Sequence, residues 1–250
     1  MKKIGIVLVV LLVFISCEKP SDCVESTGDI FVKEVEVTAF NRLEVHPGIA
    51  VVITEGTEYK VQIQTGENLM ENIEVRQEGT NLILRDNTTC NWVREFGQTT
   101  VYITAPNLDE IYSKTERTIS TNGALTFDLK IVSFDSNADG LEGAGTGDFI
   151  MQFNSANLEI NSNNVSRFYL SGTISNLATF NFYAGDSRIE AENLIAQKIH
   201  VFHRGTNDMT VFPVQSITGN LYSTGNLICK NYPVTPPNIT TYYQGQVIFN

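Results

Sequence analysis

The chain is poor in basic residues and in charge generally. Its 250 residues include 17 Lys and Arg against 28 Asp and Glu, so the formal net charge is -11. A face that binds nucleic acid must meet the phosphates with clustered Lys and Arg. The sequence has no such cluster beyond Lys2 and Lys3. We therefore expect no nucleic-acid partner.

Long hydrophobic runs are also missing after the first residues. The apolar run at residues 4–15 is short for a membrane span, but it has the length of the hydrophobic region of a secretory signal. It ends in the letters VFISC, with Ser16 before Cys17. This ending resembles a bacterial lipoprotein signal, in which the cysteine is acylated and becomes the new N-terminus. An ordinary cleaved signal with an incidental cysteine is the alternative.

The lipoprotein interpretation predicts an organisation and a location. Residues 1–16 would be a signal peptide, Cys17 the lipidated residue, residues 17–30 a polar tether and residues 31–250 one domain. Several acyl chains anchor a protein stably, so we expect a membrane partner through the lipid. The expected location is the outer membrane, either exposed at the cell surface or facing the periplasm.

Cysteines are too few for a disulfide framework. Besides Cys17 the chain has Cys23, Cys90 and Cys229. An exported compartment permits disulfides. Cys229 lies in the apolar run NLICK, where a cysteine packs as a small hydrophobe. By elimination, Cys23 and Cys90 are the candidate pair.

Catalytic and metal-binding signatures are missing too. The sequence has no nucleophile elbow, no His-Glu-x-x-His, no Cys-x-x-Cys and no phosphate loop. His200 and His203 would point to opposite faces of a strand and so could not share a metal. The glycine-rich stretch at residues 139–149 is expected to form a loop, although its carboxylates could hold calcium. We expect no catalytic residue, no metal and no cofactor.

What the sequence does contain is a succession of strands. The runs EVEVTAF, YKVQIQ, NLILRD and TTVYITAP are rich in Val, Ile and Tyr, and turn signals such as EGTE and QEGTN separate them. This pattern predicts an all-β protein.

The second half repeats with a period of twenty residues. Glycines recur at this step, and so do the aromatic residues three places before them: Gly185, Gly205, Gly225 and Gly245, with Phe182, Phe202, Tyr222 and Tyr242. Four places after each glycine stand Ile189, Met209, Cys229 and Phe249. Apolar columns at a fixed period are typical of a solenoid, in which each coil stacks on the last.

The predicted fold is therefore a single-chain parallel β-solenoid, or β-helix, with coils of about 20 residues. We expect glycine to form the corners, because sharp turns often need a positive φ, and the aromatic column to face inward. A repeat of β-hairpins and a leucine-rich repeat are alternatives that fit fewer of the units.

Several short elements of the first half match a known family in their order. They are Phe40, the strand at residues 43–45, Gly48, Ile49, Gly56, the run Glu67-Asn68-Leu69, Gly79, Leu82, the letters CNW around Cys90, and the turn at residues 106–108. Together they resemble the head GIN domain family, labelled as auto-transporter adhesins. The chain departs from the Gly-Ile-Asn motif that names the family, because Ala50 stands in place of the asparagine.

The resemblance covers roughly residues 35–250. It implies a fold similar to a parallel β-helix and an exported protein, often a lipoprotein, of a Bacteroidetes-type bacterium. No settled biochemical activity comes with it.

The candidate ligand-binding surface combines exposed aromatic residues with charges on one strand: Trp92, Tyr183, Asp186, Arg188, Glu190 and Tyr243. We expect a lipid-anchored binding or adhesion module without catalytic activity, whose partner is a glycan or an envelope or host protein. The alternative is a polysaccharide-degrading β-helix enzyme that uses the carboxylates between Asp186 and Asp208. A purely structural envelope protein is a third interpretation.

Overall fold

The computed structural model describes residues 23, 26–88, 92, 95, 97–135 and 143–250. Over these residues the chain consists of β-strands with mostly parallel pairing, interrupted by one short 3-10 helix, η2 (Met70–Asn72). The all-β expectation is confirmed. The expected signal peptide, Cys17 and the first part of the tether lie outside the described residues. Within those residues, no helix is long and apolar enough to cross a membrane.

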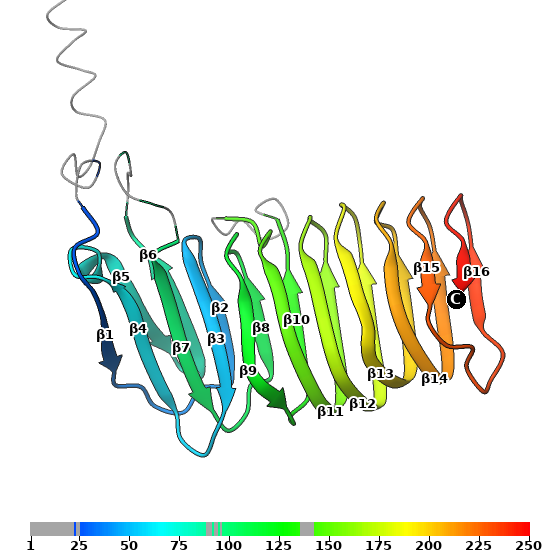
Figure 1. Ribbon diagram of the computed structural model, residues 1–250, viewed down its shortest axis with the longest axis horizontal. Coiled ribbons are helices and arrows are strands. Elements are labelled where there is room, and N and C mark those ends of the chain that lie inside the picture. The colour runs from blue at the N-terminus through cyan, green and yellow to red at the C-terminus, as the bar shows by residue number, and fades with distance from the viewer. Residues whose placement is uncertain (1–22, 24–25, 89–91, 93–94, 96, 136–142) are drawn as a thin grey trace, which may run out of the picture.

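The strands lie in two layers that run along the long axis of the molecule (Figure 1). In hydrogen-bonded order, the first layer begins with β1 (Ile30–Val35), β4 (Lys60–Gly66), β7 (Thr99–Ala105), β3 (Ile49–Glu55) and β9 (Ile119–Leu125). The second begins with β5 (Ile73–Glu78), β6 (Asn81–Asp86), β2 (Arg42–Val45), β8 (Glu110–Ser113) and β10 (Leu129–Ser133).

Four long strands then run through both layers: β11 (Asp148–Ser162), β12 (Arg167–Phe182), β13 (Arg188–His203) and β14 (Met209–Leu221). The first half of β11 pairs with β9 and its second half with β10, so each long strand bends from one layer into the other. The last strands are β15 (Leu227–Cys229) and β17 (Val247–Phe249) in the first layer and β16 (Asn238–Thr241) in the second.

Antiparallel pairing is confined to one end of the molecule. Strands β1, β4 and β5 run antiparallel to their neighbours, and the described ladders from β2 and β3 onward are parallel. In the parallel part, Phe149 pairs with Phe168, Phe168 with Ile189, Ile189 with Met209 and Met209 with Leu227, in steps of 19, 21, 20 and 18 residues. The expected step of about twenty residues is therefore present, but it is not constant.

The core fills the space between the layers with stacked apolar side chains. The rings of Phe149 and Phe168 stack with centroids 4.7 Å apart, and Phe182 lies 6.0 Å from Phe168. Cys229 also belongs to this core, where it is a free thiol, and burial raises its pKa to about 12.

The predicted inward aromatic column is largely wrong. Phe182 is fully buried as expected, but its ladder partner is His203, while Phe202 pairs with Asn181 on the outer face. Phe202 is half-buried, Tyr222 is 37% exposed and Tyr242 is 60% exposed. A shift of one residue along a strand moves a side chain to the other face. The assumption of a constant step of twenty residues therefore placed Phe202, Tyr222 and Tyr242 on the inner face, whereas they lie on the outer face.

The second predicted column is right in its first half. Ile189 and Met209 are buried partners, but the next residue in this column is Leu227. Cys229 pairs instead with Phe249, two positions further along the strands.

The corner glycines also differ from one another. Gly185 has φ of +81°, and a Cβ there would lie 2.2 Å from the backbone oxygen of Asn164, so this turn requires glycine. Gly205, Gly225 and Gly245 do not have positive φ, so the expected conformation holds for Gly185 alone among the four.

Candidate functional site

Five aromatic rings form a continuous line on the outer face of the second layer. They are called the aromatic row: Phe134, Tyr183, Phe202, Tyr222 and Tyr242. The last four come from successive coils, whereas the coil of β11 separates Phe134 from Tyr183 without adding a ring. Successive ring centroids are 6.1, 5.6, 5.1 and 4.5 Å apart. Tyr222 and Tyr242 stack with an interplanar angle of 5°, and Phe202 is tilted by 46° to Tyr222. Five rings in contact across the coils make the longest aromatic surface that the described residues show.

The backbone fixes where three of these rings lie. Tyr183, Tyr222 and Tyr242 each follow directly after the last residue of β12, β14 or β16. The amide of Tyr222 donates to the carbonyl of His203 (2.7 Å), and that of Tyr242 donates to the carbonyl of Leu221 (2.8 Å). The rings therefore lie on rigid ladder ends rather than on free loops.

Polar side chains border the row. Asn161 Oδ1 accepts hydrogen bonds from Asn181 Nδ2 (3.0 Å) and from the Tyr183 hydroxyl (3.2 Å). Among the described residues, the hydroxyls of Tyr222 and Tyr242 and the side-chain amide of Asn220 have no hydrogen-bond partner in the protein. These groups are available to a ligand.

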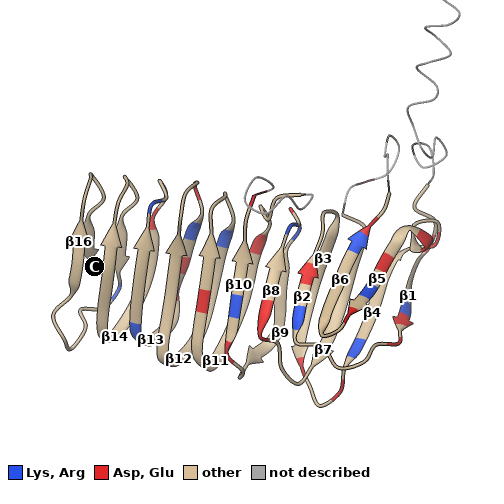
Figure 2. Ribbon diagram, turned by 180° about the vertical axis from the view of Figure 1, so that it is seen from behind, with Lys and Arg blue, Asp and Glu red and all other residues tan. Residues whose placement is uncertain are grey.

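The face around the row carries very little charge. The stretches 177–182, 209–221 and 238–241 contain no Lys, Arg, Asp or Glu. Figure 2 shows blue and red on β2, red on β8, blue on β10 and neither colour on β14 and β16. The C-terminal half of this face therefore carries little charge, with Lys198 and Arg204 as its charged residues, in a protein of net charge -11.

A buried histidine lies beneath the row. His203 is 1% exposed, its Nε2 donates to the carbonyl of Asn207 (2.8 Å) and its Nδ1 accepts from the amide of Gly205 (3.3 Å). Burial lowers the pKa of His203 below its usual value, although the bond to Asn207 and the charge of Asp208 oppose this. The ring is therefore held in its neutral form.

This geometry predicts a loss of stability in acid. The pKa of His203 is lower in the folded state than its ordinary value of 6.5, so the unfolded chain binds a proton more readily than the folded one. The free energy of unfolding is therefore unaffected by this histidine well above pH 6.5 and falls as the pH drops below that value. Urea unfolding at pH 8 and pH 5 should show this decline, and His203→Asn should reduce it. His200→Gln is the control, because His200 bonds to Thr218 at the surface (3.1 Å). A decline that is unchanged in His203→Asn would contradict the assignment.

A second buried histidine belongs to a closed polar cluster. His46 is 1% exposed, and its Nε2 lies 2.7 Å from Glu44 Oε1 and 3.3 Å from a guanidinium nitrogen of Arg85. Burial acts to raise the pKa of Glu44, but hydrogen bonds from His46 and Asn81 hold it below its usual value. Since solvent barely reaches the pair, it supports β2 and offers no open reaction site.

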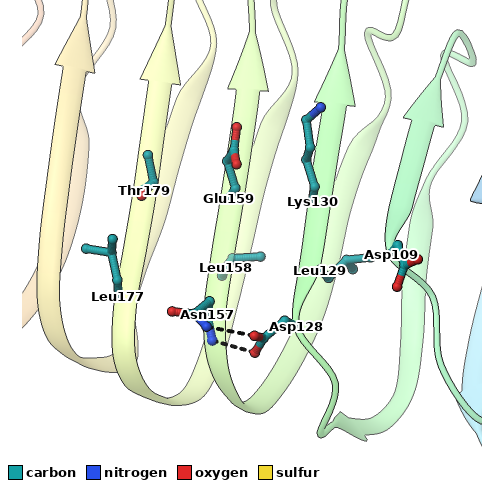
Figure 3. Close-up of a pocket in the computed structure, with 9 residues that line it drawn as sticks. All are labelled: Asp109, Asp128, Leu129, Lys130, Asn157, Leu158, Glu159, Leu177 and Thr179. Atoms are coloured by element: carbon teal, nitrogen blue, oxygen red, sulfur yellow. Dashed lines mark hydrogen bonds between the residues drawn. The ribbon is translucent and has the colours of Figure 1, made fainter.

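A shallow groove lies on the same outer face as the row, nearer the bends of the long strands (Figure 3). Its cavity volume is about 360 Å³, and most of its polar lining is already bonded to other protein groups. Asp128 accepts two 2.7 Å bonds from Asn157, and Lys130 pairs with Glu110 (2.9 Å). These bonds join neighbouring coils, so we interpret them as structural.

A second groove, of about 380 Å³, lies on the outer face of the first layer. It is lined by Ile150, Tyr169, Glu190, Glu192 and other residues of β11 to β13. The β12–β13 ladder shifts register between Tyr169 and the next paired residue, and this bulge leaves Glu192 and Asn193 both exposed. Two of the expected carboxylates therefore face one groove.

The structure does not bring the predicted surface residues together. Tyr183 belongs to the aromatic row, and Tyr243 is 64% exposed directly after Tyr242. Asp186 accepts a bond from Thr206 (2.6 Å) at a turn. Arg188 pairs with Glu190 on the outer face of the first layer. Trp92 is 78% exposed, and its amide donates a hydrogen bond to the carbonyl of Cys23 (2.9 Å), so it lies beside Cys23.

The predicted cysteine pair is described in part. Cys23 is disulfide-bonded. Cys90 lies outside the described residues, so the pairing of these two residues stays a prediction. Two carboxylates of the glycine-rich stretch that could hold calcium, Asp139 and Glu142, also lie outside them, whereas the third, Asp148, is the first residue of β11. Within the part of the chain that is described, no three His, Cys, Asp or Glu residues gather in a way that could hold a metal.

Sequence reasoning missed most of the row. It named Tyr183, assigned Phe202, Tyr222 and Tyr242 to the core, and did not consider Phe134. The available signal was the adjacent aromatic pair Phe182-Tyr183, because neighbours in a strand face opposite sides, so one ring of the pair must point outward.

Comparison with known proteins agrees with this fold. The family model described as "Putative auto-transporter adhesin, head GIN domain" matches residues 39–233. None of the curated proteins matches the chain.

Several solved structures have a similar fold. A putative adhesin from Bacteroides fragilis NCTC 9343 is 23% identical, with 90% of this chain and 100% of that chain covered and a TM-score of 0.78. A putative adhesin from Parabacteroides distasonis ATCC 8503 is 16% identical, with 90% and 100% covered and a TM-score of 0.60. A putative lipid binding protein from the same strain is 16% identical, with 90% and 99% covered and a TM-score of 0.59. Identities this low support the fold alone.

Proposed function

Because the chain belongs to the family described as "Putative auto-transporter adhesin, head GIN domain", we propose that it is a non-catalytic binding module of the bacterial envelope. The observation that carries the proposal is the aromatic row, which offers partly exposed rings on successive coils beside unpaired polar groups. Exposed tyrosines on a rigid surface are frequent binding hot spots. The row would be the contact surface of the module.

The proposal includes a solenoid arrangement and a lipid anchor. Parallel coils with a step near twenty residues would form a β-solenoid that extends the row along its length. Cys17 would carry the lipid and hold the module at the outer membrane, and its partner would be a glycan or an envelope or host protein.

Adhesion by intact cells tests the contact surface. Cells that display the full chain with Tyr222→Ser and Tyr242→Ser should bind at least about tenfold less to an adherent surface than wild type, because two hot-spot rings are lost. The matched control carries Tyr102→Ser and Tyr169→Ser. These tyrosines are 37% and 39% exposed, but they lie on the outer face of the first layer. Equal loss in both double variants would count against the row.

Cell fractionation tests the anchor. The variant Cys17→Ser should appear in the soluble fraction, because the acylated residue is gone, whereas Cys229→Ser should remain with the membranes. An unchanged membrane fraction for Cys17→Ser, together with no acyl mass on the wild-type protein, would contradict the lipid anchor.

The first-layer groove favours a second candidate function, degradation of a polysaccharide. Glu190 and Glu192 line it beside the ring of Tyr169, and glycoside cleavage uses pairs of carboxylates. Incubation with a polysaccharide panel decides between the two functions. Turnover that is lost in Glu190→Gln or Asp186→Asn and retained in the row variants would favour the enzyme.

A further inference from the structure

We propose that the ligand of the aromatic row is an uncharged carbohydrate chain that lies along the long axis of the molecule. This inference rests on the proposed function and names the ligand class of the same surface. It depends on the regular spacing of the rings, on the unpaired polar atoms beside them and on the small number of charged residues on the outer face of the second layer.

The repeat of the row fits a linear ligand better than a compact one. Tyr183, Phe202, Tyr222 and Tyr242 follow one another in steps of 5.6, 5.1 and 4.5 Å. An extended peptide presents side chains on one side about every 7 Å, because it rises about 3.3 Å per residue and alternates faces. The ring steps are shorter than this spacing, which argues against a peptide strand in register with the rings.

The polar atoms along the row require a ligand with hydroxyl groups. The Tyr222 and Tyr242 hydroxyls and the Asn220 amide have no partner among the described residues. A purely apolar ligand would cover these groups without bonding them, which is unfavourable. A sugar offers C–H groups that pack against exposed ring surface and hydroxyls that bond the amide and phenol groups, so it satisfies both kinds of surface.

The sparse charge of the face disfavours strongly charged ligands. Lys198 is the one charged residue that the second-layer parts of β12, β13, β14 and β16 carry, and Arg204 follows the end of β13. An acidic polymer would meet few cations here and a net charge of -11 on the whole chain. A cationic ligand would find no carboxylate on these strand segments.

Affinity electrophoresis of the full chain in mild detergent tests the inference. The probes are xyloglucan, galactomannan and dextran as neutral polymers, alginate as an acidic polymer and gelatin as an extended peptide. We expect at least one neutral polymer to retard the protein and Tyr222→Ser to weaken that binding about tenfold. Binding should change little when the salt rises from about 0.05 to about 0.5 M, because no ion pair is involved.

The control variant is Tyr102→Ser, since Tyr102 and Tyr222 are both 37% exposed but lie on different layers. Unchanged thermal unfolding of each variant shows that it is folded. If alginate or gelatin binds and Tyr222→Ser abolishes this binding, the row is a binding surface but the carbohydrate inference is wrong. If a neutral polymer binds equally to wild type and Tyr222→Ser, the row fails as the site. If no neutral polymer binds, the inference is also overturned.

Discussion

The variant Gly172→Ala is expected to be among the least stable single substitutions in the chain, with a loss of roughly 2–6 kcal/mol in free energy of unfolding. Gly172 lies in β12 with φ of +103°, and a Cβ there would be 1.9 Å from the backbone oxygen of Phe153 on the neighbouring coil. The added methyl group must therefore push two paired strands apart. Urea unfolding followed by circular dichroism measures the loss.

Gly123→Ala separates the contact from the backbone strain. Gly123 has φ of +93°, but a Cβ there would meet nothing within 4 Å. Its loss should stay near the strain alone, about 1–3 kcal/mol. Equal losses at Gly123 and Gly172 would show that the close approach of the coils at Gly172 has no energetic consequence.

Phe168→Ala should be the second large loss, roughly 3–5 kcal/mol, as expected for truncation of a buried Phe. Phe168 is fully buried and contacts two rings, Phe149 of the neighbouring strand β11 (centroids 4.7 Å apart) and Phe182 at the other end of β12 itself (6.0 Å). The neighbouring Tyr169 is 39% exposed, so Tyr169→Ala should cost less than about 1 kcal/mol. Chemical denaturation compares them, and similar losses would mean that Phe168 is not a core residue.

The sequence predicted the class of fold because strand signals and a repeat are both local patterns. Val, Ile and Tyr runs gave the all-β assignment, and the column of Ile189 and Met209 identified true ladder partners. Parallel pairing at a step near twenty residues followed from the same repeat. The antiparallel strands β1, β4 and β5 at one end lie outside the repeat, so the repeat could not predict them.

The candidate site could not be predicted as well, because it depends on single-residue register. From Phe182 the ladder steps to His203 and then to Leu221, which are steps of 21 and 18 residues. A constant count of twenty lands instead on Phe202 and Tyr222, which point outward. The two errors arise from bulges, where the ladder register shifts within β12 to β14. Bulges follow from packing between coils, which a single sequence does not display.

The charged part of the predicted surface was wrong for a related reason. Tyr183 is near Asp186, Arg188 and Glu190 in sequence, but the turn at Gly185 lies between them and separates the second layer from the first. Tyr183 therefore faces the second-layer side, whereas Glu190 lines the first-layer groove and pairs with Arg188. Proximity in sequence does not place residues on one surface where the chain reverses between layers.

The central claim is that the aromatic row is the surface that contacts the partner. Tyrosine nitration of the displayed protein, free and bound to its adherent surface, tests it most directly when the modified residues are read by mass spectrometry. We expect binding to protect Tyr222 and Tyr242 and to leave Tyr102 and Tyr169 as reactive as before, because the two pairs lie on opposite layers. Protection of Tyr102 and Tyr169 with Tyr222 and Tyr242 unchanged would contradict the account.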